Sequence, residues 1–133
     1  MHGDCWEGLA CGPAIEQRWH APAGQLPDDH PAWQLEAEYL ALGILNIVLV
    51  FSPHRIVLGG GVMQRGGLLA AVRARLPELV GGYLDTPLLG QEIASFLVPP
   101  ALGDDAGVLG AIALAETARK RDMAPRSNSP TSP

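Results

Sequence analysis

The clearest hydrophobic pattern in the chain is a short apolar run that leads directly into three glycines. Ile56, Val57 and Leu58 follow one another without polar alternation, which is typical of a strand buried on both faces in a layered α/β domain. Gly59–Gly61 come next, and because they lack a Cβ the chain can turn sharply and a ligand can approach the backbone. An ordinary strand-to-helix turn that binds nothing would show the same pattern, so both interpretations stay open at this point.

A long helical pattern precedes this strand. From Ala32 to Phe51 the apolar residues recur at steps of three and four, so the sequence predicts one helix that ends before a Ser-Pro pair. Glu36 and Glu38 are expected to mark its more solvated end. We expect Asp28 or Asp29 to cap its first turn, because carboxylates accept hydrogen bonds from the free N–H groups at a helix start.

A second amphipathic helix is predicted after the glycines. Its apolar positions repeat every four residues, at Leu68, Val72, Leu76 and Val80. Between them, Arg73, Arg75 and Glu78 are expected to face solvent. The helix would pack its apolar stripe on the sheet and end at Gly81.

The remaining segments complete the predicted elements. A helix is expected to begin near Pro13, a loop to span Trp19–Pro31, and a second buried strand to span Glu92–Val98. A last helix opens after Leu102, and a disordered tail rich in Pro, Ser and Arg begins at Arg119. Few strands packed with about four helices indicate an α/β fold. Two strands are too few for an isolated sheet, so we expect the chain to be part of a larger protein.

Composition limits the classes of function. The chain has 133 residues, 47% of them hydrophobic, which suits one folded domain. Met1–Ala118 holds 5 basic and 13 acidic residues, so nucleic-acid binding is not expected, since an acidic body repels phosphate backbones. Two cysteines and a start unlike a signal peptide favour a cytoplasmic protein. The apolar run Tyr39–Pro53 falls short of the roughly 20 residues that span a bilayer, so no membrane contact is expected.

Four longer motifs are more specific. They are, in chain order, H-G-D-C-W-E-G-L-A-C-G-P-A-I-E-Q-R-W, L-P-D-D-H-P-A-W-Q-L-E-A-E-Y-L-A, S-P-H-R-I-V-L-G-G-G-V-M and V-P-P-A-L-G-D-D-A-G-V-L-G-A. In this order and spacing they resemble the C-terminal half of bacterial fructokinases of the ROK family, from His2 to about Glu116. The resemblance implies a partial actin/hexokinase-like (ribonuclease H-like) ATPase domain. Residues 1–118 would form part of its C-terminal lobe, and 119–133 a disordered tail.

The resemblance also implies ligand-binding residues. Glu7 would hydrogen-bond the hydroxyls of the sugar, for which a carboxylate is suited because it can accept from two adjacent hydroxyls. Gly59, Gly60, Gly61 and Val62 would line the adenosine pocket, where missing side chains make room for the nucleotide. The implied ligands are a hexose, most often fructose, and ATP with Mg²⁺.

His2 and Cys5 are candidate metal ligands. Two ligands are half of a structural zinc site, and a solvated histidine beside an ordinary buried cysteine fits the same residues. The resemblance implies that they are the last two ligands of a structural Zn²⁺. The other two ligands would lie outside this chain, so the site would be incomplete in it.

The expected activity follows from what the resemblance covers. The aspartate that acts as general base and the loops that hold the phosphates belong to the other half of these kinases, so no catalytic residue is expected in this chain and we predict that it is inactive alone. A homodimer would be the family's assembly. Two alternatives stay open: the sugar-sensing domain of a ROK transcriptional repressor, and an independent small α/β interaction protein.

Overall fold

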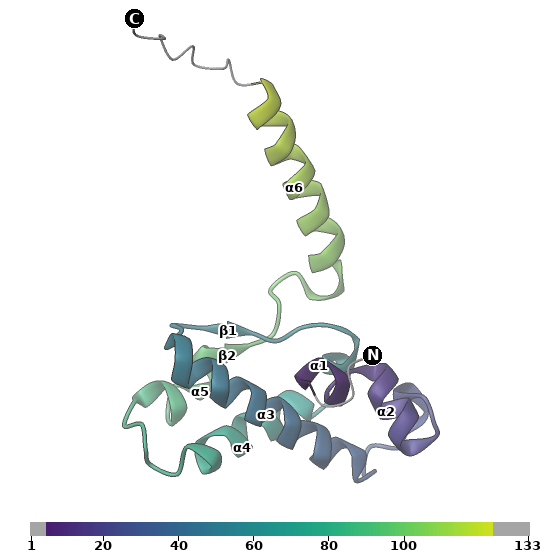
Figure 1. Ribbon diagram of the computed structural model, residues 1–133, viewed down its shortest axis with the longest axis vertical. Helices are drawn as coiled ribbons and strands as arrows, with labels where there is room; N and C mark the ends of the chain where they lie inside the picture. Colours follow the sequence, from purple (N-terminus) through teal and green to yellow (C-terminus); the bar gives the residue numbers. More distant parts are fainter. Residues whose placement is uncertain (1–4, 124–133) are drawn as a thin grey trace, which may run out of the picture. The chain divides into compact units, whose positions relative to one another are not determined.

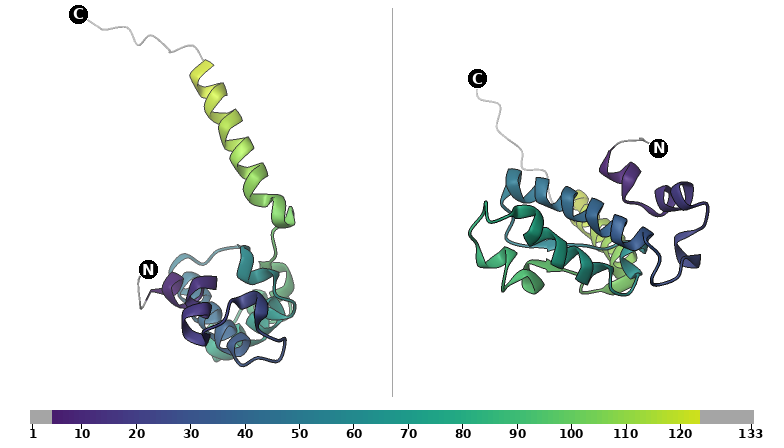
Figure 2. Two further views of the ribbon diagram at one scale, coloured as in Figure 1. Left: turned by 90° about the vertical axis from the view of Figure 1, so that its right-hand side faces the viewer. Right: turned by 90° about the horizontal axis from the view of Figure 1, so that it is seen from below.

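The computed structural model describes residues 5–123, and Figures 1 and 2 show its helices and strands. The chain divides into two compact units, Met1–Pro100 and Ala101–Pro133. The helices and strands are α1 (Trp6–Leu9), α2 (Gly12–Trp19), α3 (Ala32–Phe51), β1 (Ile56–Val57), α4 (Leu68–Val80), α5 (Ile93–Phe96), β2 (Leu97–Val98) and α6 (Ala106–Met123). Short 3-10 turns lie at Ala23–Gln25, Gly61–Gln64, Pro87–Leu89 and Gly103–Asp105. The described residues thus form a mostly helical structure with two parallel strands, consistent with part of an α/β domain.

The core of the first unit forms where α3 and α4 lie side by side, as Figure 2 shows in its right-hand view. α4 buries the four residues that the four-residue repeat predicted. The main buried cluster comprises Ala37, Leu40, Ala41, Ile44, Val48, Leu58, Leu68, Val72, Leu76, Val80, Leu89, Phe96 and Leu97. Each fully buried Leu, Ile, Val or Phe in such a cluster contributes about 1.5–3 kcal/mol. The α3–α4 pair therefore carries most of the packing on which the smaller elements rest.

The ends of these helices agree with the sequence pattern. α3 spans Ala32–Phe51 as predicted and ends at Ser52, which has a left-handed conformation with φ 45° and donates from its N–H to the carbonyl of Val48 at 3.0 Å. α4 ends at Gly81, with φ 58°. A residue with positive φ stops the helical hydrogen bonding and satisfies a free carbonyl, which explains why both helices end where they do.

The predicted cap of α3 is wrong. Neither Asp28 nor Asp29 bonds its first turn; instead, the N–H of Ala32 donates to Nδ1 of His30 at 3.1 Å. The side chain of Asp28 forms an ion pair with Arg65. The imidazole is held in place by a T-shaped ring contact with Trp19, whose centroid lies 4.7 Å away, and this tertiary contact makes the histidine the available acceptor.

β1 and β2 form a two-stranded parallel sheet with Ile56 opposite Leu97 and Val57 opposite Val98. Because α4 connects the two strands, they form a β-α-β unit. The prediction that the first strand is buried on both faces is wrong, since the side chain of Val57 is 59% exposed. Figure 1 shows α3 and α4 on one side of these strands, which leaves the other face of the sheet open within this unit.

The second strand is also shorter than predicted. Of Glu92–Val98 only Leu97–Val98 is extended, and Ile93–Phe96 forms the single helical turn α5. Arg73, which was expected to face solvent, is half-buried and donates to the carbonyls of Ala94 at 3.1 Å and of Leu97 at 2.6 Å. This long-range hydrogen bonding, together with burial of Phe96, favours the turn over the extended conformation that the local sequence indicates.

By length and composition alone, α3 could cross a membrane. One such helix is weak evidence for a span, because the core helix of a soluble protein passes the same test. Here one face of α3 packs into the cluster shared with α4.

The second unit consists mainly of α6. This helix continues through residues 119–123, so the expected start of a disordered tail at Arg119 is wrong for those residues. The rest of the expected tail, 124–133, lies outside the described residues.

Candidate functional site

The ligand-binding residues implied by the sequence come together at one cavity of about 610 Å³ in the first unit. Glu7 lies on one wall and Gly59, Gly60, Gly61 and Val62 on another. These two segments are about fifty residues apart in the sequence, so the fold and not local structure brings them together. The other lining residues are Trp6, Ala10, Cys11, Gly12, Pro13, Ala23, Leu40, Leu58 and Met63.

Gly59, Gly60 and Gly61 in the wall of this cavity are glycines for different structural reasons. A Cβ on Gly59 would lie 2.8 Å from Cγ of Pro100, so this glycine is required for packing. Gly60 has φ 97° and ψ 169°, a conformation that is essentially restricted to glycine. A Cβ on Gly61 would meet no atom within 4 Å and its φ is not positive, so only here does the missing side chain leave open space at an unstrained backbone.

The opposite wall is the short helix α1. The thiol of Cys5 caps it by accepting from the N–H of Gly8 at 3.4 Å. The indole of Trp6 contacts Gly43 in the middle of α3, where any Cβ would overlap the ring. The lack of a side chain at Gly43 therefore allows α1 to pack against α3. Glu7 is the residue after Trp6, and its carboxylate is exposed at the cavity.

The chemistry of this lining suits a small organic ligand. Its residues are mostly apolar or glycine, and Glu7 is the only carboxylate among the lining residues in the described part of the chain. Cavities with apolar walls and a few placed polar groups are typical of small-molecule sites. A carboxylate at the edge can accept hydrogen bonds from hydroxyls, and an apolar wall with an open glycine can take the flat part of a nucleotide.

The described residues do not build a metal site by themselves. No group of three or more His, Cys, Asp or Glu side chains that could hold a metal is found within residues 5–123. Cys5 is half-buried at the start of α1, and His2 lies outside the described residues. Cys5 and Cys11 form no disulfide with each other.

Arg65 makes structural contacts that the sequence analysis missed. Its guanidinium lies 4.5 Å above the ring of Trp33 and donates to the carbonyl of Leu26 at 3.3 Å. Trp33 in turn donates from Nε1 to the carbonyl of Pro27 at 2.8 Å. Arg65 directly follows the turn Gly61–Gln64, so these contacts tie the end of the glycine segment to the loop before α3. Nothing local in the sequence signals such a contact, because its partners are more than thirty residues away.

Glu36 is a second residue whose environment the sequence did not reveal. The sequence predicted that Glu36 lies at the solvated end of α3, but its side chain is 0% exposed. Neither of its carboxylate oxygens has a hydrogen-bond partner in the described structure. Burial raises the pKa of Glu36 to about 7, and the positive charge of Arg18 opposes that rise. The spacing of the sequence did indicate this burial. Glu36 lies three residues after Trp33 and four before Leu40, so it shares the buried face of α3 with them.

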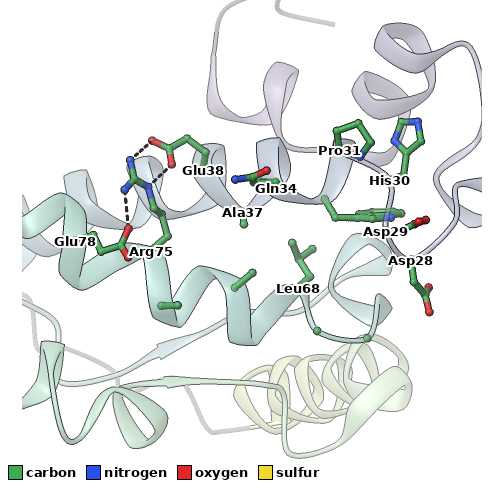
Figure 3. Close-up of a pocket in the computed structure, with 15 residues that line it drawn as sticks. Asp28, Asp29, His30, Pro31, Gln34, Ala37, Glu38, Leu68, Arg75 and Glu78 are labelled. Carbon is green, nitrogen blue, oxygen red and sulfur yellow. Dashed lines mark hydrogen bonds and ion pairs between the residues drawn. The ribbon is translucent and has the colours of Figure 1, made fainter.

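A larger groove of about 800 Å³ runs beside α3 and α4 and contains none of the predicted ligand-binding residues (Figure 3). Its charged groups are largely engaged with one another. Arg75 bonds both oxygens of Glu38 and donates to Glu78 at 2.8 Å, and this contact holds the pKa of Glu38 below its usual value. We therefore favour the cavity of about 610 Å³ as the ligand site. Its carboxylate, Glu7, is surrounded by apolar residues and glycines, whereas Glu38 and Glu78 of the larger groove are paired with Arg75.

Comparison with known proteins identifies relatives of this chain. A model of the ROK family matches residues 1–118. The chain is 42% identical over 123 residues to a putative fructokinase of Bacillus subtilis (strain 168), covering 92% of the chain and 41% of that protein. It is 39% identical over 122 residues to a fructokinase of Zymomonas mobilis, covering 90% of the chain and 39% of the relative. A fructokinase of Pediococcus pentosaceus is 34% identical over 119 residues, with 90% and 40% covered. The chain thus spans about two fifths of the length of these relatives.

Proposed function

Because the chain belongs to the ROK family, we propose that it is part of a sugar kinase that transfers a phosphoryl group from Mg²⁺-bound ATP to a hexose, with fructose as the preferred substrate. Relatives named as fructokinases support a sugar kinase of this family. The preference for fructose and the use of ATP by this chain are the proposal.

The observation that carries the proposal is the shared cavity. The family resemblance assigns Glu7 to the sugar and the segment Gly59–Val62 to the nucleotide, and both line one cavity of about 610 Å³. Phosphoryl transfer requires the acceptor hydroxyl and the nucleotide to lie in one site, because catalysis depends on their relative position. The proximity of the two segments therefore supports a two-substrate site.

In this proposal Glu7 binds the sugar and Gly59–Val62 bind the nucleotide, and neither segment transfers the proton. Glu7 accepts hydrogen bonds from two sugar hydroxyls and so fixes the orientation of the ring. Gly61 and Val62 provide an open apolar wall for the adenosine, Gly60 supplies the backbone conformation of this turn, and Gly59 allows it to pack against Pro100. Mg²⁺-ATP supplies the phosphoryl group when bound. The general base and the phosphate loops come from the part of the relatives that this chain does not span, so the chain alone is expected to be inactive.

Further parts of the proposal rest on the family resemblance. His2 and Cys5 would contribute two ligands to a structural Zn²⁺, with the others supplied from outside the described residues. A homodimer, a cytoplasmic location and the lack of nucleic-acid or membrane partners also remain predictions. So does the alternative of a sugar-sensing repressor domain, which the coding sequence upstream of Met1 would test, because a repressor would carry a helix-turn-helix there.

The proposal can be tested by ligand titration of the ¹⁵N-labelled chain. Fructose is expected to shift the amide resonances around Glu7, and Mg²⁺-ATP those of Gly60, Gly61 and Val62, with the weak affinity of an incomplete site. Glu7→Gln should abolish the fructose-induced shifts, whereas Glu16→Gln, an exposed carboxylate of α2, should leave them unchanged. Shifts by neither ligand, or fructose shifts that survive Glu7→Gln, would refute the assigned roles. Phosphorylation of fructose by the purified chain would refute the predicted inactivity.

A further inference from the structure

Glu36 is the one carboxylate in the described structure that is fully buried, and the proposed chemistry does not use it. It lies on the face of α3 between two packed clusters: Trp33, one turn earlier, belongs to the cluster with Ile15 and Leu26, and Leu40, one turn later, to the main core. Val62 of the glycine segment packs against both clusters. Glu36 thus lies at the junction behind the candidate site, where an ionised carboxylate is costly unless a charged partner is near.

The charged group that acts on Glu36 is Arg18 of α2. The guanidinium of Arg18 lies 5.1 Å from the centroid of the Tyr39 ring, one turn further along α3. It does not hydrogen-bond Glu36; its Nη2 instead donates to the carbonyl of Leu9 at 3.0 Å. Arg18 therefore joins Tyr39 of α3 to the last residue of α1, and its charge acts on the buried carboxylate.

This arrangement connects Glu36 to the ligand-binding wall. α1 has only four residues, so it has little intrinsic stability and depends on its tertiary contacts. Its start rests on Gly43 through Trp6 and its end is held by Arg18 through Leu9. Glu7 lies between these two contacts. A hydrogen bond from a charged donor is about twice as strong as a neutral one, so the position of Arg18 bears directly on how firmly Glu7 is held.

We propose that Glu36 and Arg18 are positioning residues that hold α1, and with it Glu7, against α3 for sugar binding. The ionised carboxylate attracts Arg18 into its place over Tyr39, from which it reaches the Leu9 carbonyl, and the uncharged carboxyl holds it less firmly. The sugar-binding part of this inference rests on the proposed role of Glu7. The coupling between Glu36, Arg18 and α1 does not.

The coupling can be tested on the full ¹⁵N-labelled chain without any ligand. The amides of Glu7 and Gly8 and the indole N–H of Trp6 would be followed from about pH 5.5 to about pH 8.5, a range that brackets the pKa of about 7 raised by burial of Glu36. These resonances are expected to titrate with one midpoint near that value, and Glu36→Gln should remove the titration. In the Arg18→Gln variant the amide resonance of Tyr39 serves as the reporter of Glu36 ionisation. Its titration midpoint should move to higher pH, because the cation that lowers the Glu36 pKa is lost.

The controls separate this coupling from other titrating groups. Glu16→Gln changes an exposed carboxylate of α2 and should leave the midpoint unchanged. Titration of the α1 resonances that survives in the Glu36→Gln variant would come from another group and would overturn the inference. The inference would also be overturned if the pH midpoint reported by the Tyr39 amide were the same in the Arg18→Gln variant as in the wild-type chain.

The functional part has its own readout. Fructose affinity of the wild-type chain is expected to rise about threefold to tenfold between pH 6 and pH 8, the range of one charge-assisted hydrogen bond, and to stay flat in Glu36→Gln. Failure of the wild-type chain to bind fructose at either pH would contradict the proposed role of Glu7, while the ligand-free titration would still decide the coupling. Fructose affinity with the same pH profile in Glu36→Gln would show that the pair does not position Glu7.

Discussion

At the scale of single residues, Glu36 gives the stability of the chain an unusual dependence on pH. Its carboxyl has a pKa of about 7 in the folded chain, raised by burial from 4.5. A carboxyl whose folded pKa is raised binds protons more tightly when folded, so the sign is the reverse of that for a salt-bridged acid. Below pH 4.5 it has no effect, between 4.5 and 7 stability falls as pH rises, and above 7 the loss is complete.

Glu36→Gln should therefore stabilise the chain at high pH. The amide has nearly the same shape but cannot ionise, so the unfolding free energy should rise by about 1–3 kcal/mol at pH 8 and change little at pH 4. Urea denaturation at the two pH values measures this difference, with Glu16→Gln as the exposed control. A Glu36→Gln variant that is less stable at pH 8 would show that the attraction of Arg18 outweighs the cost of burying the ionised carboxylate.

The glycines at the cavity allow packing and ligand binding to be separated. Gly59→Ala should cost about 1–3 kcal/mol of stability, because its Cβ would lie 2.8 Å from Cγ of Pro100. Gly61→Val meets no atom within 4 Å at its Cβ, so its effect on stability should stay within about 0.5 kcal/mol. It should nevertheless weaken Mg²⁺-ATP binding by about tenfold or more, since the side chain enters the cavity. Thermal melts and nucleotide titrations on both variants check this, and nucleotide affinity unchanged in Gly61→Val would place the nucleotide elsewhere.

At the scale of elements, α1 is positioned by a close approach to α3. Gly43→Ala would normally stabilise an exposed helix by up to about 1 kcal/mol. Here its Cβ would overlap the ring of Trp6, so α1 should be displaced. We expect a red shift of tryptophan emission and loss of the fructose-induced shifts at Glu7. Asn46→Ala, an exposed position on the same helix, should show neither effect. Retention of fructose binding by Gly43→Ala would mean that α1 does not depend on this contact.

The long helices could be predicted because each has one periodic apolar face. α3 and the buried positions of α4 follow directly from steps of three and four residues. The turn Ile93–Phe96 and the cap by His30 could not be predicted in this way. Each depends on a side chain from another part of the sequence, Arg73 in one case and Trp19 in the other. Periodicity reports which face of a helix is apolar, and it says nothing about partners from other segments.

The candidate site was predictable only in part, for the same reason. Glu7 and Gly59–Val62 were found because they lie in recognisable motifs, and the cavity contains both. Arg18 and Glu36 lie within two of these motifs and Arg65 follows a third, but the motifs do not indicate that Arg18 and Arg65 bond carbonyls of other segments or that Glu36 is buried. Motifs can thus point to residues proposed to bind a ligand, whereas contacts between distant segments are visible only in the structure.

At the scale of the whole molecule, each unit has apolar side chains in contact with solvent. In the first unit Val50, Phe51 and Val57 are 71%, 74% and 59% exposed, and in α6 Val108 and Leu114 are 65% and 72% exposed. Exposed apolar side chains favour association of chains, because association removes them from water. We expect the purified chain to self-associate at micromolar concentration and the double variant Val50→Ser, Phe51→Ser to associate less. Sedimentation velocity at several concentrations measures this, and a chain that remains monomeric throughout would contradict it.

The most direct test of the central claim is a chimera in which residues 1–118 replace the matching segment of the Bacillus subtilis relative. The relative supplies the part of the protein that this chain does not span. If the cavity is the sugar and nucleotide site, the chimera should phosphorylate fructose, Glu7→Gln should lower kcat/KM for fructose by about a hundredfold or more, and Glu16→Gln should leave it unchanged. A folded chimera that phosphorylates fructose equally well with Glu7→Gln would contradict the account.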